Sequence, residues 1–173
     1  MKISYCPVDG YDKAVMRPVV GPDELPSPEK MTLRQLRDVP NSLLAIEKTV
    51  EEYIVEPLIR LARIRRPKYR IERQYRIGRG SADYAILRAN EVRSIIEVKV
   101  RCRRPQNGVW SQCKDVAQAK KYATPFDCPF VLIDCDTIAC FKPGRVKPSF
   151  ETRRHNLTRE DLKEIHSYLA NEE

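Results

Sequence analysis

The sequence predicts an α/β domain with a central mixed β-sheet flanked by helices. Between residues 41 and 61, apolar residues recur at three- and four-residue steps, as on one face of a helix. Further along the chain, runs of β-branched and aromatic residues are separated by turn-forming residues, which is typical of strands. The 173 residues, of which 42% are hydrophobic and 32% charged, match one globular domain with an appended arm.

Residues 1–40 are predicted to form this arm, because they hold six of the thirteen prolines. One short helix is expected within it, at 32–37. The arm either contacts a partner or substrate or is a poorly ordered terminus. The folded domain is predicted to span 41–173, with its core at 42–141 and a C-terminal helix at 158–170.

The first helix of the domain is expected to begin at Asn41 or Ser42, either of which can cap it, and to end near Leu61. Pro57 lies within this segment and is expected to kink the helix. Glu47 shares the apolar stripe, and an acid on the buried side of a helix needs a partner. The alternative is that Glu47 lies at the edge of the stripe and reaches water.

A strand is expected at 69–77, with one face formed by Tyr69, Ile71, Arg73, Tyr75 and Ile77. A turn at 78–80 leads into a β-hairpin, whose two strands at 84–87 and 92–100 flank the turn-forming residue Asn90.

The hairpin carries charges that an apolar strand pair normally avoids. If Arg88 faces Val92 across a three-residue loop, Asp83 lies opposite Glu97, and Lys99 projects to the same side. Removing two carboxylates from water is costly without a cation, and carboxylates with backbone oxygens suit a hard divalent ion. A two-residue loop without a compensating bulge puts Asp83 and Glu97 on opposite faces.

The rest of the chain adds a helix at 111–123, two strands at 129–135 and 137–141, and a final helix capped by Thr158. Gln118 and Tyr122 project from one face of the first of these helices. Trp110 is expected to anchor this helix, and the alternative is stacking on a base.

The net charge of +8 is concentrated between residues 60 and 79, where nine basic residues accompany a single acid. Such a band is typical of proteins that bind a polyanion, most often nucleic acid. The alternative is a solvated basic face.

Several other classes of function lack support in the sequence. No secretory leader and no apolar run of membrane-spanning length is present, so we expect a cytoplasmic protein without membrane contact. The six cysteines form no Cys-x-x-Cys pair and are expected to be buried thiols rather than metal ligands. Neither of the two histidines has a recognisable catalytic partner.

Four motifs stand in a fixed order along residues 42–141. They are Glu47 ten residues before Pro57, Asp83-Tyr84, Glu97-Val98-Lys99, and Gln118-x-x-x-Tyr122. In this order the chain resembles the PD-(D/E)xK nuclease superfamily. It is most similar to the N-terminal nuclease domain of type I restriction enzyme R subunits and to their stand-alone relatives. Ala82 stands where the superfamily usually has proline.

The resemblance implies a restriction-endonuclease-like core and a nuclease that uses Mg²⁺ or Mn²⁺. Asp83, Glu97 and the carbonyl of Val98 are then the metal ligands, and Glu47 holds a metal-bound water or a second ion. Lys99 orients or deprotonates the attacking water and stabilises negative charge. Gln118 and Tyr122 contact the phosphate backbone or brace the site. The expected DNA-binding residues are Arg73, Arg76, Arg79, Arg101, Arg103, Arg104 and Lys120.

Three alternatives remain open from the sequence. The first is a structure-selective endonuclease of the Holliday junction resolvase type, which usually works as a homodimer. The second is a DNA-binding module of the same fold without catalytic activity. The third is a structural salt-bridge cluster of Asp83, Glu97 and Lys99, whose net negative charge is unfavourable without a metal.

Overall fold

The computed structural model describes residues 27–101 and 110–171 of the chain. Within these two ranges, six strands form one sheet in sequential order. All neighbours are antiparallel except β3 and β4, which are parallel. The strands are β1 (Tyr69–Ile77), β2 (Gly80–Arg88), β3 (Glu91–Val98), β4 (Phe130–Ile133), β5 (Thr137–Phe141) and β6 (Phe150–Arg153). The predicted mixed α/β sheet is therefore confirmed, and β6 is a strand that the sequence pattern did not indicate.

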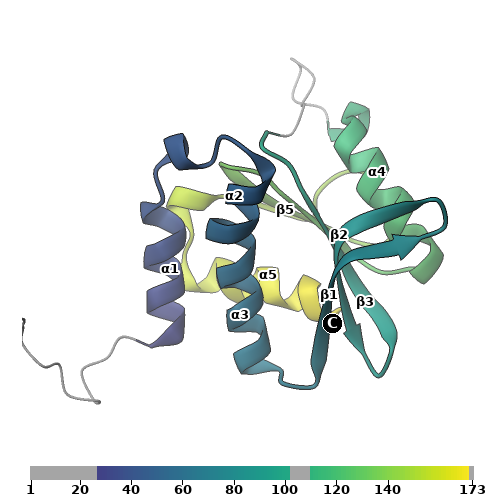
Figure 1. Ribbon diagram of the computed structural model, residues 1–173, viewed down its shortest axis with the longest axis horizontal. Helices are drawn as coiled ribbons and strands as arrows, with labels where there is room; N and C mark the ends of the chain where they lie inside the picture. The colour runs from purple at the N-terminus through teal and green to yellow at the C-terminus, as the bar shows by residue number, and fades with distance from the viewer. Residues whose placement is uncertain (1–26, 102–109, 172–173) are drawn as a thin grey trace, which may run out of the picture.

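Helices cover both faces of the sheet, with α1, α3 and α5 on one side and α4 on the other (Figure 1). The α-helices are α1 (Pro28–Asp38), α2 (Glu47–Val50), α3 (Glu56–Arg65), α4 (Lys114–Ala123) and α5 (Arg159–Ala170). The shorter turns are η2 (Asn41–Leu43), the π-helical η3 (Glu51–Val55), η4 (Trp110–Gln112), η5 (Thr124–Phe126) and η6 (Arg154–Asn156). The α4 helix lies on the connection between the two parallel strands, as such a crossover requires.

The α1 helix is longer than the predicted 32–37, because Ser27 caps it and Pro28 is tolerated in its first turn. Leu36 is fully buried in the same core cluster as residues of α3 and α5. The buried Arg154 donates hydrogen bonds to the carbonyls of Leu36 and Cys135 and to the side chain of Asn41. Residues 1–26 lie outside the described residues, and the domain boundary at residue 40 stays a prediction.

The predicted helix start at residue 41 or 42 is wrong. Ile46 has an extended backbone (φ −134°, ψ 154°), so the helix begins at Glu47, after the separate turn η2. From there the helical segments α2, η3 and α3 follow without a gap to Arg65. The amide of Glu56 donates to the carbonyl of Glu51, a widened turn directly before Pro57. Pro57 therefore lies in the first turn of α3, where its missing N–H is tolerated.

The predicted single face of strand β1 is also wrong. Tyr69 and Ile71 pack against the core cluster on the α1, α3 and α5 side, whereas Tyr75 and Ile77 pack against the cluster under α4. Gln74 lies between these two pairs in a left-handed conformation (φ 49°), which interrupts the strand alternation. The end of the β1–β2 hairpin consequently turns toward α4 (Figure 1).

The β2–β3 turn differs from the predicted three-residue loop. It has two residues, Ala89 and Asn90, both with positive φ, as favoured in tight hairpins. A bulge between Ile86 and Leu87 then adds one residue to β3, and Tyr84 pairs with Ile96. Beyond the bulge the register is the predicted one, which continues to bring Asp83 level with Glu97.

Asp134 accepts hydrogen bonds from the amides of Asp136 and Thr137, which holds the turn between β4 and β5. Two local predictions, for Trp110 and for the cysteines, are confirmed. Trp110 is 8% exposed and packs edge-on against Phe141. The four cysteines within the described residues, Cys113, Cys128, Cys135 and Cys140, are buried free thiols.

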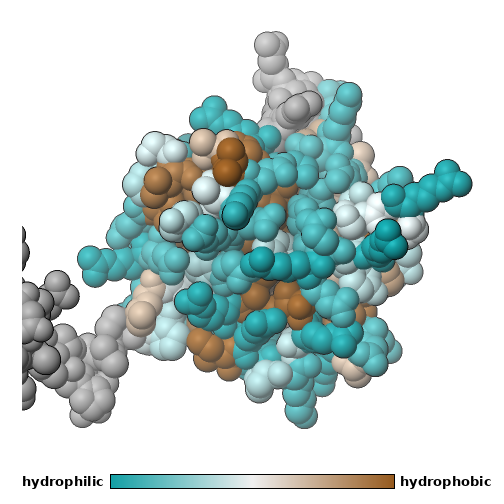
Figure 2. Space-filling model, viewed as in Figure 1, coloured by the Kyte–Doolittle hydropathy of each residue, from teal (hydrophilic) through white to brown (hydrophobic). Residues whose placement is uncertain are grey.

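The surface is mainly polar on the face that Figure 2 shows, with small separate hydrophobic areas. Exposed large hydrophobic side chains in residues 27–101 and 110–171 are Met31, Leu43, Ile46 and Ile64. No helix described in those two ranges has the length and apolar character needed to cross a membrane.

Candidate active site

Asp83 lies where the ladder between β2 and β3 ends. Its Oδ2 accepts a hydrogen bond from the backbone amide of Val98 at 2.7 Å. Its Oδ1 accepts a second one from the side-chain amide of Gln74 at 3.3 Å. The carboxylate is thus held from both neighbouring strands while it stays partly exposed. Two hydrogen bonds leave further lone pairs on both oxygens for another ligand.

Glu97 is the deeply buried acid of this site, with 1% of its surface exposed. Its Oε1 accepts hydrogen bonds from Lys99 Nζ at 2.9 Å and from Gln118 Nε2 at 2.6 Å. Its Oε2 is buried and has no hydrogen-bond partner among the described residues. A buried carboxylate oxygen without a partner is costly, so this position favours a cation or a proton.

The electrostatics follow from this burial. Desolvation and the charge of Asp83 together raise the pKa of Glu97 to about 7, although the hydrogen bond from Lys99 opposes them. Burial alone lowers the pKa of Lys99, but its hydrogen bond to Glu97 and the nearby acids outweigh this and raise it. Lys99 therefore remains an ammonium ion at neutral pH.

Glu47 reaches this group from the start of α2. Its Oε1 lies 3.8 Å from Lys99 Nζ, and its side chain is 53% exposed. The prediction that Glu47 lies on the buried side of its helix is therefore wrong, and the alternative position at the edge of the stripe is the observed one. Glu47 is the first residue of α2, directly after the extended Ile46.

The α4 helix completes the wall of the site. Gln118 bonds Glu97, and Tyr122 packs over the start of β2. A Cβ at Gly80 would lie 2.6 Å from the Tyr122 hydroxyl, so glycine is needed for this close approach. Gln118 and Tyr122 thus contact neighbouring strands at the same end of the antiparallel β2–β3 pair.

The predicted DNA-binding residues lie in different settings. Arg76, Arg79 and Arg101 are exposed, and Lys120 is half-buried. Arg73 forms an ion pair with Glu56 and lies over the ring of Tyr84, 5.5 Å from its centroid. Arg103 and Arg104 lie outside the described residues.

Two residues at the site were missed from the sequence. Gln74 bonds Asp83, and Ser81 Oγ donates to Gln74 Oε1 at 3.2 Å. No local signal in the sequence marked them. In the structure Arg73 pairs with Tyr84 and Tyr75 with Ala82, which leaves Gln74 level with Asp83.

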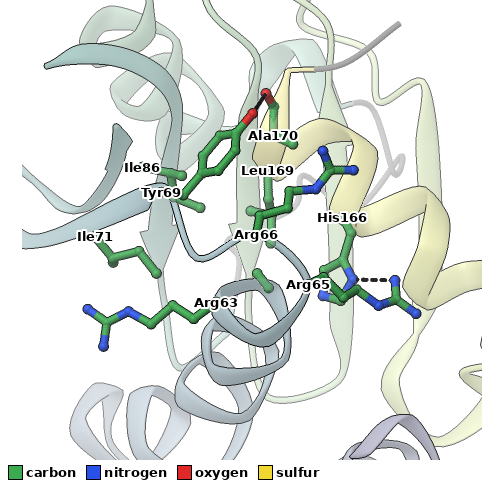
Figure 3. Close-up of a pocket in the computed structure, with 10 residues that line it drawn as sticks. Arg63, Arg65, Arg66, Tyr69, Ile71, Ile86, His166, Leu169 and Ala170 are labelled. Atoms are coloured by element: carbon green, nitrogen blue, oxygen red, sulfur yellow. Dashed lines mark hydrogen bonds between the residues drawn. The ribbon is translucent and has the colours of Figure 1, made fainter. Parts of the chain in front are cut away.

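A small cavity lies away from these carboxylates, between α3, β1 and α5 (Figure 3). It holds about 10 Å³, which is close to the least volume that admits one water. His166 lies in its wall, where Arg65 donates to its Nδ1. Burial and the charge of Arg65 lower the pKa of His166 to about 4, so the ring is neutral at physiological pH. This cavity is too small for a substrate.

No family model and no curated protein matches the sequence. The structure is nevertheless similar to solved ones. The type IIG restriction endonuclease BpuSI superposes on 77% of this chain with a TM-score of 0.53, at 18% sequence identity. The DrdV–DNA complex superposes on 84% of the chain with a TM-score of 0.55, at 11% identity. The chain has a restriction-endonuclease-like fold.

Both of these chains are much longer than this one. The match covers 17% of the BpuSI chain and 14% of the DrdV chain, so this chain spans less than a fifth of either. The similarity therefore concerns one part of those proteins.

The residues of this restriction-endonuclease-like fold fit a divalent cation with few protein ligands. In the described part of the chain, no three His, Cys, Asp or Glu side chains are grouped so that they could hold a metal. Glu47 is thus not a third member of a group with Asp83 and Glu97. The partnerless Oε2 of Glu97 beside the Asp83 carboxylate suits an ion such as Mg²⁺, which usually keeps several waters.

Proposed function

We propose that this chain is a metal-dependent DNA nuclease domain that hydrolyses phosphodiester bonds with Mg²⁺ or Mn²⁺. The observation that supports this most strongly is the buried, partnerless Oε2 of Glu97 next to Asp83 and Lys99. A salt bridge alone does not account for both carboxylates in their ionised forms, because one ammonium ion neutralises only one of them. The restriction-endonuclease-like fold gives independent support.

Asp83 and Glu97 would hold the metal, together with the carbonyl of Val98. When bound, a divalent ion supplies Lewis acidity at the scissile phosphate and lowers the pKa of a bound water. Lys99, whose pKa is raised, acts as an ammonium ion that orients the attacking water and stabilises negative charge on the phosphate. This favours charge stabilisation by Lys99 over general-base catalysis. Glu47 would bind a metal-coordinated water through its exposed carboxylate.

The α4 helix has a supporting role in this proposal. Gln118 fixes the Glu97 carboxylate through Oε1, which leaves Oε2 for the cation. Tyr122 braces the start of β2, close to Asp83 in the chain. Exposed basic residues, including Arg76, Arg79 and Arg101, would contact phosphates and make DNA binding weaken with salt.

We infer that the chain is a nuclease module comparable to the N-terminal nuclease domain of type I restriction R subunits. The order of the Glu47, Asp83, Glu97-Val98-Lys99 and Gln118 motifs supports this comparison. The similar structures contain the fold as a small part of a longer chain. A cytoplasmic location and a homodimer stay predictions.

The test is digestion of linear, circular, single-stranded and branched DNA with Mg²⁺, Mn²⁺ or EDTA. We expect cleavage with either metal, and none with EDTA. Asp83→Ala and Lys99→Ala should abolish cleavage and largely keep DNA binding. The exposed residues Asp38 and Lys142 provide matched controls, and Asp38→Ala and Lys142→Ala should cleave normally.

Each other outcome points to one alternative. Cleavage confined to branched DNA, with a symmetric dimer in solution, indicates a structure-selective endonuclease. DNA binding without cleavage by the wild type indicates a binding module. Normal cleavage by both site variants means that the catalytic residues are misassigned.

A further inference from the structure

Gln74 has a backbone conformation that glutamine disfavours. Its φ of 49° lies in the left-handed region, which is strained for a residue other than glycine. The other described non-glycine residues with positive φ, Ala89, Asn90, Asp127 and Asn171, lie in a turn or at the end of a helical segment. Gln74 instead lies in the middle of a nine-residue strand. Such strain persists where the surrounding structure holds it, and it concentrates at functional sites.

The side chain of Gln74 is aimed at the candidate metal ligand. A carboxylate can only accept hydrogen bonds, so the atom that faces Asp83 Oδ1 at 3.3 Å is the amide nitrogen. Ser81 Oγ donates to the amide oxygen of Gln74 at 3.2 Å, which fixes this orientation. Asp83 Oδ2 is fixed separately by the amide of Val98. Both carboxylate oxygens are thus oriented before any cation binds.

The fold itself needs the backbone turn at this position but not the glutamine side chain. The turn carries Tyr75 and Ile77 to the α4 side of the sheet, and a glycine adopts it without strain. The amide of Gln74 is exposed and its bonds stay within the group formed with Asp83 and Ser81. Stability alone therefore favours glycine at residue 74.

We propose that Gln74 is a positioning residue that orients the Asp83 carboxylate for cation binding. The strained backbone at residue 74 is retained because it carries the side-chain amide that bonds Asp83 Oδ1. The inference rests on the proposed function, because it assigns Asp83 as a metal ligand. Residues that orient metal ligands typically change metal affinity about 10–100-fold when they are substituted.

The test measures metal affinity and stability separately, without DNA. Binding of Mn²⁺ is followed by the loss of the free-ion signal in electron paramagnetic resonance, and melting temperatures are measured in EDTA. Gln74→Ala keeps the strain and removes the amide, so we expect about 10-fold weaker Mn²⁺ binding without a rise in melting temperature. Gln74→Gly removes both, so we expect the same loss of affinity with a melting temperature higher by roughly 2–4 °C.

Ala89→Gly is the matched control, since Ala89 has nearly the same φ of 51° in the β2–β3 turn. It should raise the melting temperature and leave Mn²⁺ binding unchanged. Unchanged Mn²⁺ affinity in both Gln74 variants overturns the inference, as does a lower melting temperature of Gln74→Gly. If the wild type binds no Mn²⁺ and cleaves no DNA, the proposed function and the inference both fail. If the wild type binds Mn²⁺ and both Gln74 variants bind it equally well, the inference about Gln74 fails and the proposed function stands.

Discussion

The metal-free protein should lose stability as the pH rises from about 4.5 to 8, because of one buried carboxyl. Glu97 has an ordinary pKa of 4.5 when unfolded, and burial raises its pKa to about 7 in the folded state. The folded state therefore binds the proton more tightly than the unfolded state. The resulting stability is fully present below the unfolded pKa and is lost as the pH rises through the folded pKa.

The size of this effect follows from the two pKa values. One pKa unit corresponds to about 1.4 kcal/mol, so raising the pKa of Glu97 from 4.5 to about 7 is worth about 3 kcal/mol. For a protein of this length, such a loss lowers the melting temperature by roughly 6–12 °C. The Glu97→Gln variant does not ionise and should lack this component.

The assay compares melting temperatures of the wild type and Glu97→Gln in EDTA across this pH range. From the low to the high end of this pH range, the free energy of unfolding of Glu97→Gln should rise by about 3 kcal/mol relative to that of the wild type. Glu91 lies on the same strand but is exposed, so the melting temperature of Glu91→Gln should depend on pH as that of the wild type does. Saturating Mg²⁺ should flatten the wild-type curve, because the cation favours the ionised carboxylate. Parallel curves for wild type and Glu97→Gln in EDTA would refute the assignment of Glu97 as a proton-binding buried acid.

Two other predictions concern stability, one through packing and one through buried hydrogen bonds. Gly80→Ala places a methyl group 2.6 Å from the Tyr122 hydroxyl, so it should cost about 1–3 kcal/mol in urea unfolding. The cost should shrink in a Tyr122→Phe background, and an equal cost there would mean that the hydroxyl is not the obstacle. Arg154→Met leaves carbonyls of the α1 helix and of the β4–β5 connection without their donor, so it should cost about 3 kcal/mol in the same assay. A neutral Arg154→Met would mean that water replaces the guanidinium.

Elements with a strong local signal were predictable from the sequence. The final helix is an example, since Thr158 and Asp161 form a reciprocal capping box and α5 begins directly after it. Strand β1 also has its predicted bounds at 69–77. In the final helix, local preference and tertiary burial favour the same structure.

Gln74 lacked such a signal. No glycine or proline marks residues 69–77, so alternation along the whole strand was the natural expectation. The change of face arises because the hairpin must cover both the α3 side and the α4 side of the sheet. This requirement comes from tertiary packing. It is met at a glutamine, a residue type that does not indicate a left-handed backbone. The start of α2 is similar, since Ile46 is extended although its apolar spacing continues the helical pattern.

The β2–β3 hairpin explains why the candidate site was predictable although its loop was not. The loop is one residue shorter than expected, and the bulge between Ile86 and Leu87 adds one residue back. The two deviations compensate because both faces of the hairpin are buried. Tyr84 and Ile96 pack on the α3 side, and a slip by one residue would move every side chain to the wrong face. Burial therefore fixes the register of Asp83 and Glu97, and the turn adapts to that register.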